Sequence, residues 1–160
     1  MSERGQDLQL VAALLAAQST LSLATTNENG QAYVTPLFYY FVEPEFALCW
    51  LSSADSQHSR NLARNSAAAV TVYRQTEKWQ EICGVQMTGQ AVRIEDRARR
   101  KTIVAGYMKR FHLGTIFRLA ISRSVLYAFR PAWIRYLDNS KRFGYKTELT
   151  LPPEGNDAPH

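Results

Sequence analysis

The sequence predicts a mainly β domain, an antiparallel barrel with helices attached to it. About six runs of β-branched, aromatic and other apolar residues follow one another in near-sequential hairpin order. Strands and helices do not alternate regularly, so a parallel, doubly wound sheet fits poorly. The 160 residues are enough for one domain with a hydrophobic core and would be crowded as two.

The chain opens with a predicted helix followed by a hairpin. Apolar residues recur at helical spacing, and alanines fill the gaps, so a helix is predicted over residues 6–18, with Asp7 as its cap. A β-branched and apolar run predicts a strand over residues 20–26. Residues 27–30 are predicted to form a tight turn, because the Asn and Gly residues found there accept the positive φ that hairpins need.

The second strand-like run, residues 32–42, contains Pro36. Proline cannot donate a hydrogen bond to a sheet, so we expect an edge, a bulge or a ligand-facing interruption at this position. The elements predicted next are a turn at 43–45, a strand over 46–51, a polar turn at 52–56, a helix over 56–64 and a strand over 67–73.

Residues 79–95 indicate one extended strand or a bent pair, with Gly84 and Gly89 marking bulges or close approaches. The remaining predicted elements are a helix over 96–110 capped by Asp96, a helical turn at 113–119, and a strand over 124–137 interrupted by Pro131. One domain is therefore predicted over residues 1–150. Pro, Gly, Asn and Asp dominate residues 151–160, which predicts a disordered C-terminal tail.

The composition narrows the possible partners. Lys plus Arg is 19 against 14 for Asp plus Glu, a net charge of +5 that suits a phosphate-bearing ligand, weak nucleic-acid contact or simple solubility. No basic stripe interleaved with aromatic residues is present, so we expect no nucleic-acid partner. The short cluster at residues 97–101 is interpreted as a solvated helix face, with a phosphate or an acidic partner as the alternative.

Other signals are weak. The two cysteines lack the CxxC spacing and the three histidines are far apart, so no metal site is predicted. The apolar run near the start is too short to cross a bilayer and lacks the features of a signal peptide. We therefore expect a cytoplasmic protein without membrane contact.

The residues that point most clearly to chemistry lie between Ser52 and Asn61, where an apolar strand runs into a polar turn and a helix. A helix start exposes unpaired N–H groups and partial positive charge, which favours anions such as phosphate. Side chains that could add donors are Ser52, Ser53, Ser56, Ser59, His58 and Arg60. Because Ser and Asp are also preferred helix caps, a purely structural cap is the alternative.

Four stretches resemble the FMN-binding split barrels that are similar to pyridoxamine 5'-phosphate oxidase. They are residues 21–26, 29–38, 51–61 and 85–91, in that order and spacing. Shorter pieces at 84–86, 107–111, 138–139 and 143–144 resemble a small, poorly characterised branch of the same superfamily. The resemblance extends over residues 10–145.

This resemblance implies a six-stranded antiparallel split β-barrel of Greek-key type with flanking helices, paired into a homodimer that holds FMN between the subunits. It implies an oxidoreductase acting on a small molecule, and assigns no catalytic residue. The implied cofactor contacts are Thr35, Pro36, Leu37 and Phe38 beside the ring, Ser52, Ser53, Ser56, Gln57, His58 and Arg60 at the phosphate, and Gln86 at the ring or ribityl chain. Trp133 and Tyr136 would close the groove from the partner subunit.

The chain departs from the oxidase pattern at the cations. Gln57 and His58 stand where that family has Arg and Lys, and the ring-side strand offers Pro36 and Phe41 instead of Arg and Lys. Each charge-assisted bond lost costs about 1.5–3 kcal/mol. The open alternatives are a non-catalytic protein that binds or senses a flavin, haem or deazaflavin, and a structural dimer without a cofactor. For Gln86, a buried core glutamine is an equal alternative.

Overall fold

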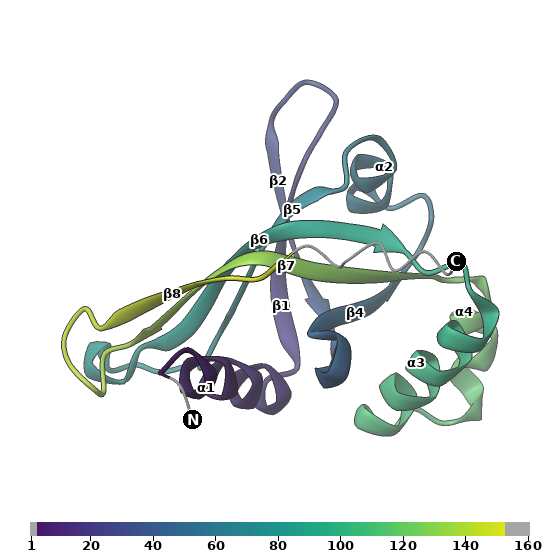
Figure 1. Ribbon diagram of the computed structural model, residues 1–160. Helices are drawn as coiled ribbons and strands as arrows, with labels where there is room; N and C mark the ends of the chain where they lie inside the picture. Colours follow the sequence, from purple (N-terminus) through teal and green to yellow (C-terminus); the bar gives the residue numbers. More distant parts are fainter. Residues whose placement is uncertain (1–2, 153–160) are drawn as a thin grey trace, which may run out of the picture.

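The computed structural model describes residues 3–152, in which eight strands form one antiparallel sheet that curls into a split barrel (Figure 1). The strands are β1 (Thr20–Thr26), β2 (Ala32–Phe38), β3 (Tyr40–Val42), β4 (Ala47–Ser52), β5 (Ala67–Tyr73), β6 (Cys83–Arg93), β7 (Val125–Asp138) and β8 (Lys146–Thr150). Their order across the sheet is β2-β1-β5-β6-β7-β4-β3, and β8 pairs with β7. The predicted mainly β split barrel is confirmed.

The helices attach at the ends and open sides of this sheet (Figure 1). They are α1 (Glu3–Ala17), α2 (Gln57–Arg64), α3 (Arg97–Arg110) and α4 (Arg118–Arg123), with short 3-10 turns η1 (Glu43–Glu45), η2 (Trp79–Glu81) and η3 (Thr115–Phe117). Two of the predicted caps are present: Ser56 Oγ accepts a hydrogen bond from Ser59 N, and the Asp96 carboxylate accepts one from Arg99 N. The cap expected at Asp7 is wrong, because α1 begins at Glu3 and the Asp7 carboxylate accepts from Thr147 Oγ1 at 2.9 Å instead. None of the described helices is long and apolar enough to cross a membrane.

Two strands were not expected from the sequence. The predicted strand 32–42 is divided at Tyr39, whose side chain is buried and whose hydroxyl donates to Leu15 O at 2.6 Å. Residues up to Phe38 pair with β1, whereas residues from Tyr40 onward pair with β4. Strands β2 and β3 therefore lie at opposite ends of the sheet. Strand β8 escaped prediction because Leu149 is its one buried residue, which gives almost no apolar alternation.

Both prolines inside strands occupy positions that need no amide hydrogen. Pro36 lies in β2, an edge strand, opposite Ser22. Pro131 lies at a bulge, where the register of β6 against β7 shifts between Thr88 and Gly89. The bulge expected at Gly89 is therefore confirmed.

The core fills the inside of the barrel and is capped by α1. Its largest side chains include Trp50 and Phe129, both fully buried, and Trp50 stacks on Tyr127 with ring centroids 5.8 Å apart. A second, smaller cluster lies between α3 and the outer face of β4 and β7, and includes Ile103 and Ala128. Leu151 packs on the main core, while residues 153–160 of the predicted tail lie outside the described residues.

Candidate functional site

The polar turn between β4 and α2 is organised around Ser56. Its hydroxyl donates to Ser53 O at 2.9 Å, lies 2.8 Å from Ser59 Oγ, and accepts from Ser59 N at 3.3 Å. Ser56 is thus the helix cap that the sequence offered as the structural alternative. The amides of Ser59 and Arg60 are both taken by Ser56, whereas those of Gln57 and His58 have no acceptor among the described residues. These two N–H groups are the ones available to an anion.

His58 is buried beside this cap. Its Nε2 lies 2.7 Å from Ser52 Oγ and 3.2 Å from Ser56 Oγ, so the ring connects the end of β4 to the start of α2. Burial lowers the pKa of His58 below its ordinary value. The imidazole is therefore neutral near neutral pH, and an anion placed against it would favour its protonated form.

The buried His58 predicts a specific pH dependence of stability. Because its pKa is lower in the folded than in the unfolded chain, folding stability is fully present above about pH 6.5 and falls as the pH drops below that value. Urea unfolding at about pH 7.5 and pH 5 measures this loss, and the carboxyl groups with lowered pKa titrate below that range. We expect His58→Gln, which keeps a hydrogen-bonding side chain, to lose less stability over this interval than the unaltered chain. An equal loss in both would contradict the assignment.

The mouth of the turn carries one cation and one carboxylate. The Arg60 guanidinium donates to Asp55 O and, at 2.8 Å, to Gln57 Oε1, and remains exposed. The Ser53 hydroxyl donates to the Asp55 carboxylate and holds the pKa of this exposed group below its ordinary value. The turn therefore offers an anion one guanidinium and two main-chain amides, and opposes it with one negative charge.

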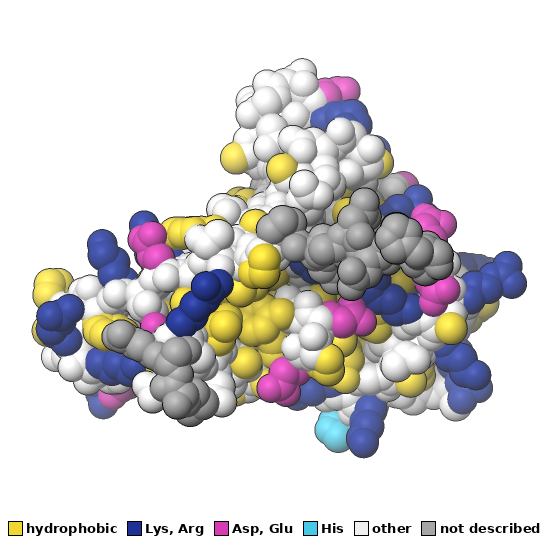
Figure 2. Space-filling view, in the orientation of Figure 1, with side chains coloured by type: hydrophobic (Ala, Val, Ile, Leu, Met, Phe, Trp, Pro, Cys, Tyr) yellow, Lys and Arg dark blue, Asp and Glu magenta, His cyan; other side chains and the backbone are white. Residues whose placement is uncertain are grey.

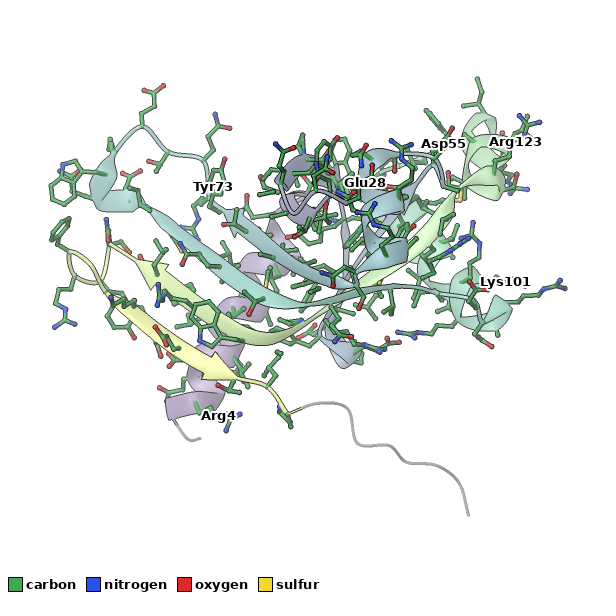
Figure 3. The ribbon with its side chains drawn as sticks, turned by 90° about the horizontal axis from the view of Figure 1, so that it is seen from above. Arg4, Glu28, Asp55, Tyr73, Lys101 and Arg123 are labelled. Atoms are coloured by element: carbon green, nitrogen blue, oxygen red, sulfur yellow. The ribbon has the colours of Figure 1, made fainter. Side chains whose placement is uncertain are left out.

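Asn61 fastens α2 to the barrel wall. It is fully buried; its Nδ2 donates to Thr25 Oγ1 at 2.9 Å, and its Oδ1 accepts from Gln57 Nε2 at 2.9 Å. An outer ion pair joins Arg64 to Glu28 at 3.4 Å. Figure 3 shows Glu28 and Asp55 on the same side of the molecule, where the β1–β2 hairpin and the α2 turn lie next to each other.

The free edge of β2 presents main-chain groups. Tyr39 N donates to Ser19 O, and Asn27 N donates to Gln31 O, so the hydrogen-bonded pairs of β1 and β2 involve the odd-numbered residues. The N–H and C=O groups of even-numbered residues therefore point away from β1. Pro36 occupies one of these positions, and its missing N–H breaks no sheet hydrogen bond.

Alternation along β2 also separates the four ring-side residues predicted from the sequence. Pro36 and Phe38 are on the exposed outer face, whereas Thr35 and Leu37 are half-buried on the inner face. Leu37 packs against the main core. Any contact of Leu37 with a ligand at the outer face would therefore use its main chain.

The outer face of the sheet is hollowed beside Pro36. A cavity of about 480 Å³ is lined by residues that include Ser22, Pro36, Thr71 and Tyr73. Gln86 lies directly opposite Thr71 in the next strand and is exposed on this same face. The alternative of a buried core glutamine is therefore wrong.

Trp133 and Tyr136 lie on opposite faces of β7. Trp133 is half-buried on the outer face, where the Arg135 guanidinium lies 5.1 Å from its ring centre. Tyr136 points to the core and its hydroxyl donates to Asp138 at 3.0 Å. Because residues an odd number apart in a strand face opposite sides, the expectation that Tyr136 closes a groove is wrong.

The structure brings Ser52, Ser56, Gln57, His58 and Arg60 together in the turn. Within the described part of the chain, no hydrogen bond, ion pair or ring contact joins this turn to Gln86 or Trp133. Strand β1 connects the turn with the outer face that carries Gln86 and Trp133. Its Thr25 accepts a hydrogen bond from α2, and its Ser22 lines the outer cavity.

Sequence reasoning missed a cation near the β2 edge. The Phe111 ring, at the end of α3, contacts the Phe38 ring with centroids 5.2 Å apart, and the Arg110 guanidinium lies 5.6 Å from the Phe111 ring centre. Burial by the surrounding chain raises the pKa of Tyr107, whose ring also contacts Phe111. The similarity of residues 107–111 to one branch of the superfamily was the only available signal, and it did not indicate where the helix would dock.

Comparison with known proteins agrees with this architecture. The family described as pyridoxamine 5'-phosphate oxidase matches residues 8–138. A UPF0306 protein of Photorhabdus laumondii is 26% identical over 141 residues, covering 88% of this chain and 94% of that protein. The chain belongs to the pyridoxamine 5'-phosphate oxidase family.

Solved structures share the fold at low identity. A conserved hypothetical protein from Mycobacterium tuberculosis superimposes with a TM-score of 0.75 at 18% identity, covering 96% of this chain and 94% of that one. A heme binding protein from Mycobacterium smegmatis has a TM-score of 0.71 at 18% identity, covering 94% and 59%. An FAD-binding protein from Mesorhizobium loti has a TM-score of 0.60 at 16% identity, covering 84% and 92%. These likenesses show the fold.

Proposed function

We propose that this protein binds FMN at the interface of a homodimer and uses it to oxidise or reduce a small molecule. One observation carries the proposal: β1 and β2 support an anion-accepting turn at one end and a free main-chain edge beside a hollow outer face at the other. A phosphate-bearing planar cofactor needs both features. Family membership supports the choice of a flavin.

The donor set of the turn fits a phosphate, although it is weaker than a site with several cations. Gln57 and His58 would donate their main-chain amides, and Arg60 would supply the positive charge. His58 would strengthen the interaction on protonation. Asp55 opposes it, and because the pKa of this carboxyl lies below its ordinary value, its charge persists over the pH range in which His58 titrates. The predicted affinity is therefore sensitive to substitution of that carboxylate.

The ring would lie along the free edge of β2, where Val34 and Phe38 offer N–H groups and Pro36 a carbonyl. Gln86 and Trp133 face the same outer side and are available to the ring or ribityl chain. When bound, FMN supplies electron and hydride transfer, and the protein supplies orientation and polarity. No side chain is assigned as a catalytic acid or base.

The homodimer rests on the outer face of the β2 side of the sheet. Val34, Phe38 and Tyr73 are 61%, 57% and 60% exposed, which is unusual for large apolar side chains gathered on one face. A second copy laid across this face would cover them and enclose the cavity beside Pro36. The mass of the protein in solution, measured by light scattering, tests this part separately from cofactor binding.

A second candidate is a protein that holds a flavin, haem or deazaflavin without turnover. The single exposed guanidinium at the turn and the opposing Asp55 favour it over a tight FMN enzyme. The mass of any small molecule released when the native protein is denatured distinguishes the cofactors. Bound flavin that neither reduced nicotinamide nor a partner reductase can reduce would favour this second candidate.

Replacing Arg60 tests the phosphate turn. We expect Arg60→Ala to weaken FMN binding by about one to two powers of ten, since a charge-assisted hydrogen bond is worth roughly 1.5–3 kcal/mol. Stability should change by less than about 0.5 kcal/mol, because Arg60 is exposed. Fluorescence titration with FMN measures the affinity, and Asp55→Asn should tighten it.

The matched control is Arg64→Ala, which removes the same charge from the other end of the same helix. Its FMN affinity should stay within about twofold of the unaltered protein. If both arginine variants bind FMN like the unaltered protein, the turn is only a helix cap. If saturating FMN produces no spectral or thermal shift at all, the flavin proposal is lost.

A further inference from the structure

At the end of the molecule where α3 packs against α4 lies a groove of about 370 Å³, and the flavin proposal uses none of the residues that line it. Apolar side chains line part of it, namely Val104, Met108 and Ile121. The basic side chains that line it are Arg97, Arg100, Lys101 and Arg118. None of the described residues that line it carries a carboxylate. The fold creates this basic groove by bringing the 97–101 cluster against α4.

Most of this positive charge is uncompensated. Within residues 3–152, Arg97, Lys101 and Arg118 make no salt bridge and are exposed. The acidic neighbours are otherwise engaged, since Glu95 lies 3.8 Å from Arg93 and Asp96 caps α3. Figure 2 shows Lys and Arg side chains at this end as well as at the opposite one, and in Figure 3 both Lys101 and Arg123 lie at this end, away from Tyr73.

Arg100 has a different role in the groove. Its guanidinium donates to Ile121 O and Ser124 O, both at 2.9 Å, and so ties α3 to the end of α4. Its charge stays beside the groove while its position is fixed. Arg100 is therefore unsuitable for a test of binding, because its loss would also loosen the two helices.

Large apolar side chains protrude on either side of Arg118 in the chain. Ile116, Leu119 and Phe117 are 85%, 62% and 47% exposed, and the α4 helix buries no residue. Exposed apolar residues flanked by Lys and Arg form the pattern of a segment that lies in a lipid interface, with the apolar side chains below the headgroups. An acidic protein partner would use the cations but would leave the protruding side chains without a reason.

We propose that the α3–α4 end docks on the surface of an anionic lipid bilayer. Ile116, Phe117 and Leu119 enter the interface, while Lys101, Arg97 and Arg118 pair with lipid phosphates. Charge complementarity selects the anionic surface, and the protruding side chains set the orientation. The sequence expectation of no membrane contact rested on the lack of a spanning segment, which a surface contact does not need. This proposal is independent of FMN binding.

Sedimentation of the full chain with vesicles tests the proposal. We expect binding to vesicles of about one-third phosphatidylglycerol in phosphatidylcholine, little binding to phosphatidylcholine alone, and loss of binding in about 0.5 M salt. Lys101→Glu with Arg118→Glu should weaken binding more than about twentyfold, from roughly fivefold per cation removed. Ile116→Ser with Leu119→Ser should weaken binding without changing the thermal midpoint, because both side chains are exposed.

The matched control variant combines Lys146→Glu with Arg142→Glu, which reverses two exposed cations on and beside β8 at the opposite end of the molecule (Figure 1). Its binding to vesicles should fall far less than that of the Lys101 and Arg118 variant. Equal losses would mean that net charge alone drives adsorption, and would overturn the proposal. Absence of binding at low salt would also overturn it. So would an Ile116 and Leu119 variant that binds vesicles normally but has a lower molecular mass in solution, because the apolar patch would then serve self-association.

Discussion

Gly89→Ala is expected to destabilise the protein by about 3 kcal/mol or more, which would lower the thermal midpoint by ~10 °C. A Cβ at this position would lie 2.0 Å from Arg130 O and 2.9 Å from Pro131 Cα. These are main-chain atoms, so no rotation of a side chain can relieve the clash. The β6–β7 pairing must open at its bulge, where Ala132 is the residue without a partner in β6. Urea unfolding measures the loss.

Gly114→Ala is the matched control. Gly114 has a φ of −76°, which alanine adopts readily, and a Cβ there would meet nothing within 4 Å. We expect a change within about 0.5 kcal/mol, with a slight gain because alanine restricts the unfolded chain. Similar stabilities for the two variants would show that β6 and β7 do not approach each other at Gly89 as described.

Elements with strong local signals were predictable from the sequence. The strands at 20–26 and 67–73 have the bounds predicted for them, because apolar and β-branched residues recur there over the whole strand. Ser56 and Asp96 cap their helices as expected, since capping depends on the next three residues alone. The bulge predicted at Gly89 is present, because glycine inside a strand indicates close main-chain approach.

Features that depend on distant residues were not predictable. The break at Tyr39 depends on a hydrogen bond to Leu15, 24 positions earlier. In the candidate site, the spacing of Ser52 to Arg60 indicated an anion-accepting helix start. It did not indicate that the Ser56 hydroxyl is used in capping the helix, or that Asp55 lies where it opposes an anion. The role of Asn61 depends on its hydrogen bond to the distant Thr25, and the basic groove depends on the packing of α4 against α3. Neither contact could be inferred from the sequence.

Asn61→Ala is expected to cost roughly 2–3 kcal/mol of stability and to weaken any ligand held by the α2 turn. Asn61 is fully buried and Thr25 is 3% exposed, so the substitution leaves the Thr25 hydroxyl without a partner and removes the acceptor of Gln57. Helix α2 then loses its buried attachment to β1 and keeps the exposed Arg64–Glu28 pair. Urea unfolding and FMN titration of the same variant measure the two effects.

A double-mutant cycle with Thr25→Val separates the hydrogen bond from the loss of packing. Thr25→Val alone leaves the Asn61 amide unsatisfied, so it should also destabilise, whereas the double variant has no buried group left unpaired between these two positions. We expect the double variant to lose less stability than the sum of the two single losses, with a coupling of about 1 kcal/mol or more. Arg64→Ala, which breaks only an exposed ion pair, should change stability by less than about 0.5 kcal/mol. Additive losses in the cycle would contradict a direct contact between Asn61 and Thr25. Unchanged FMN binding in Asn61→Ala would show that the phosphate site does not depend on the attachment of α2 to β1.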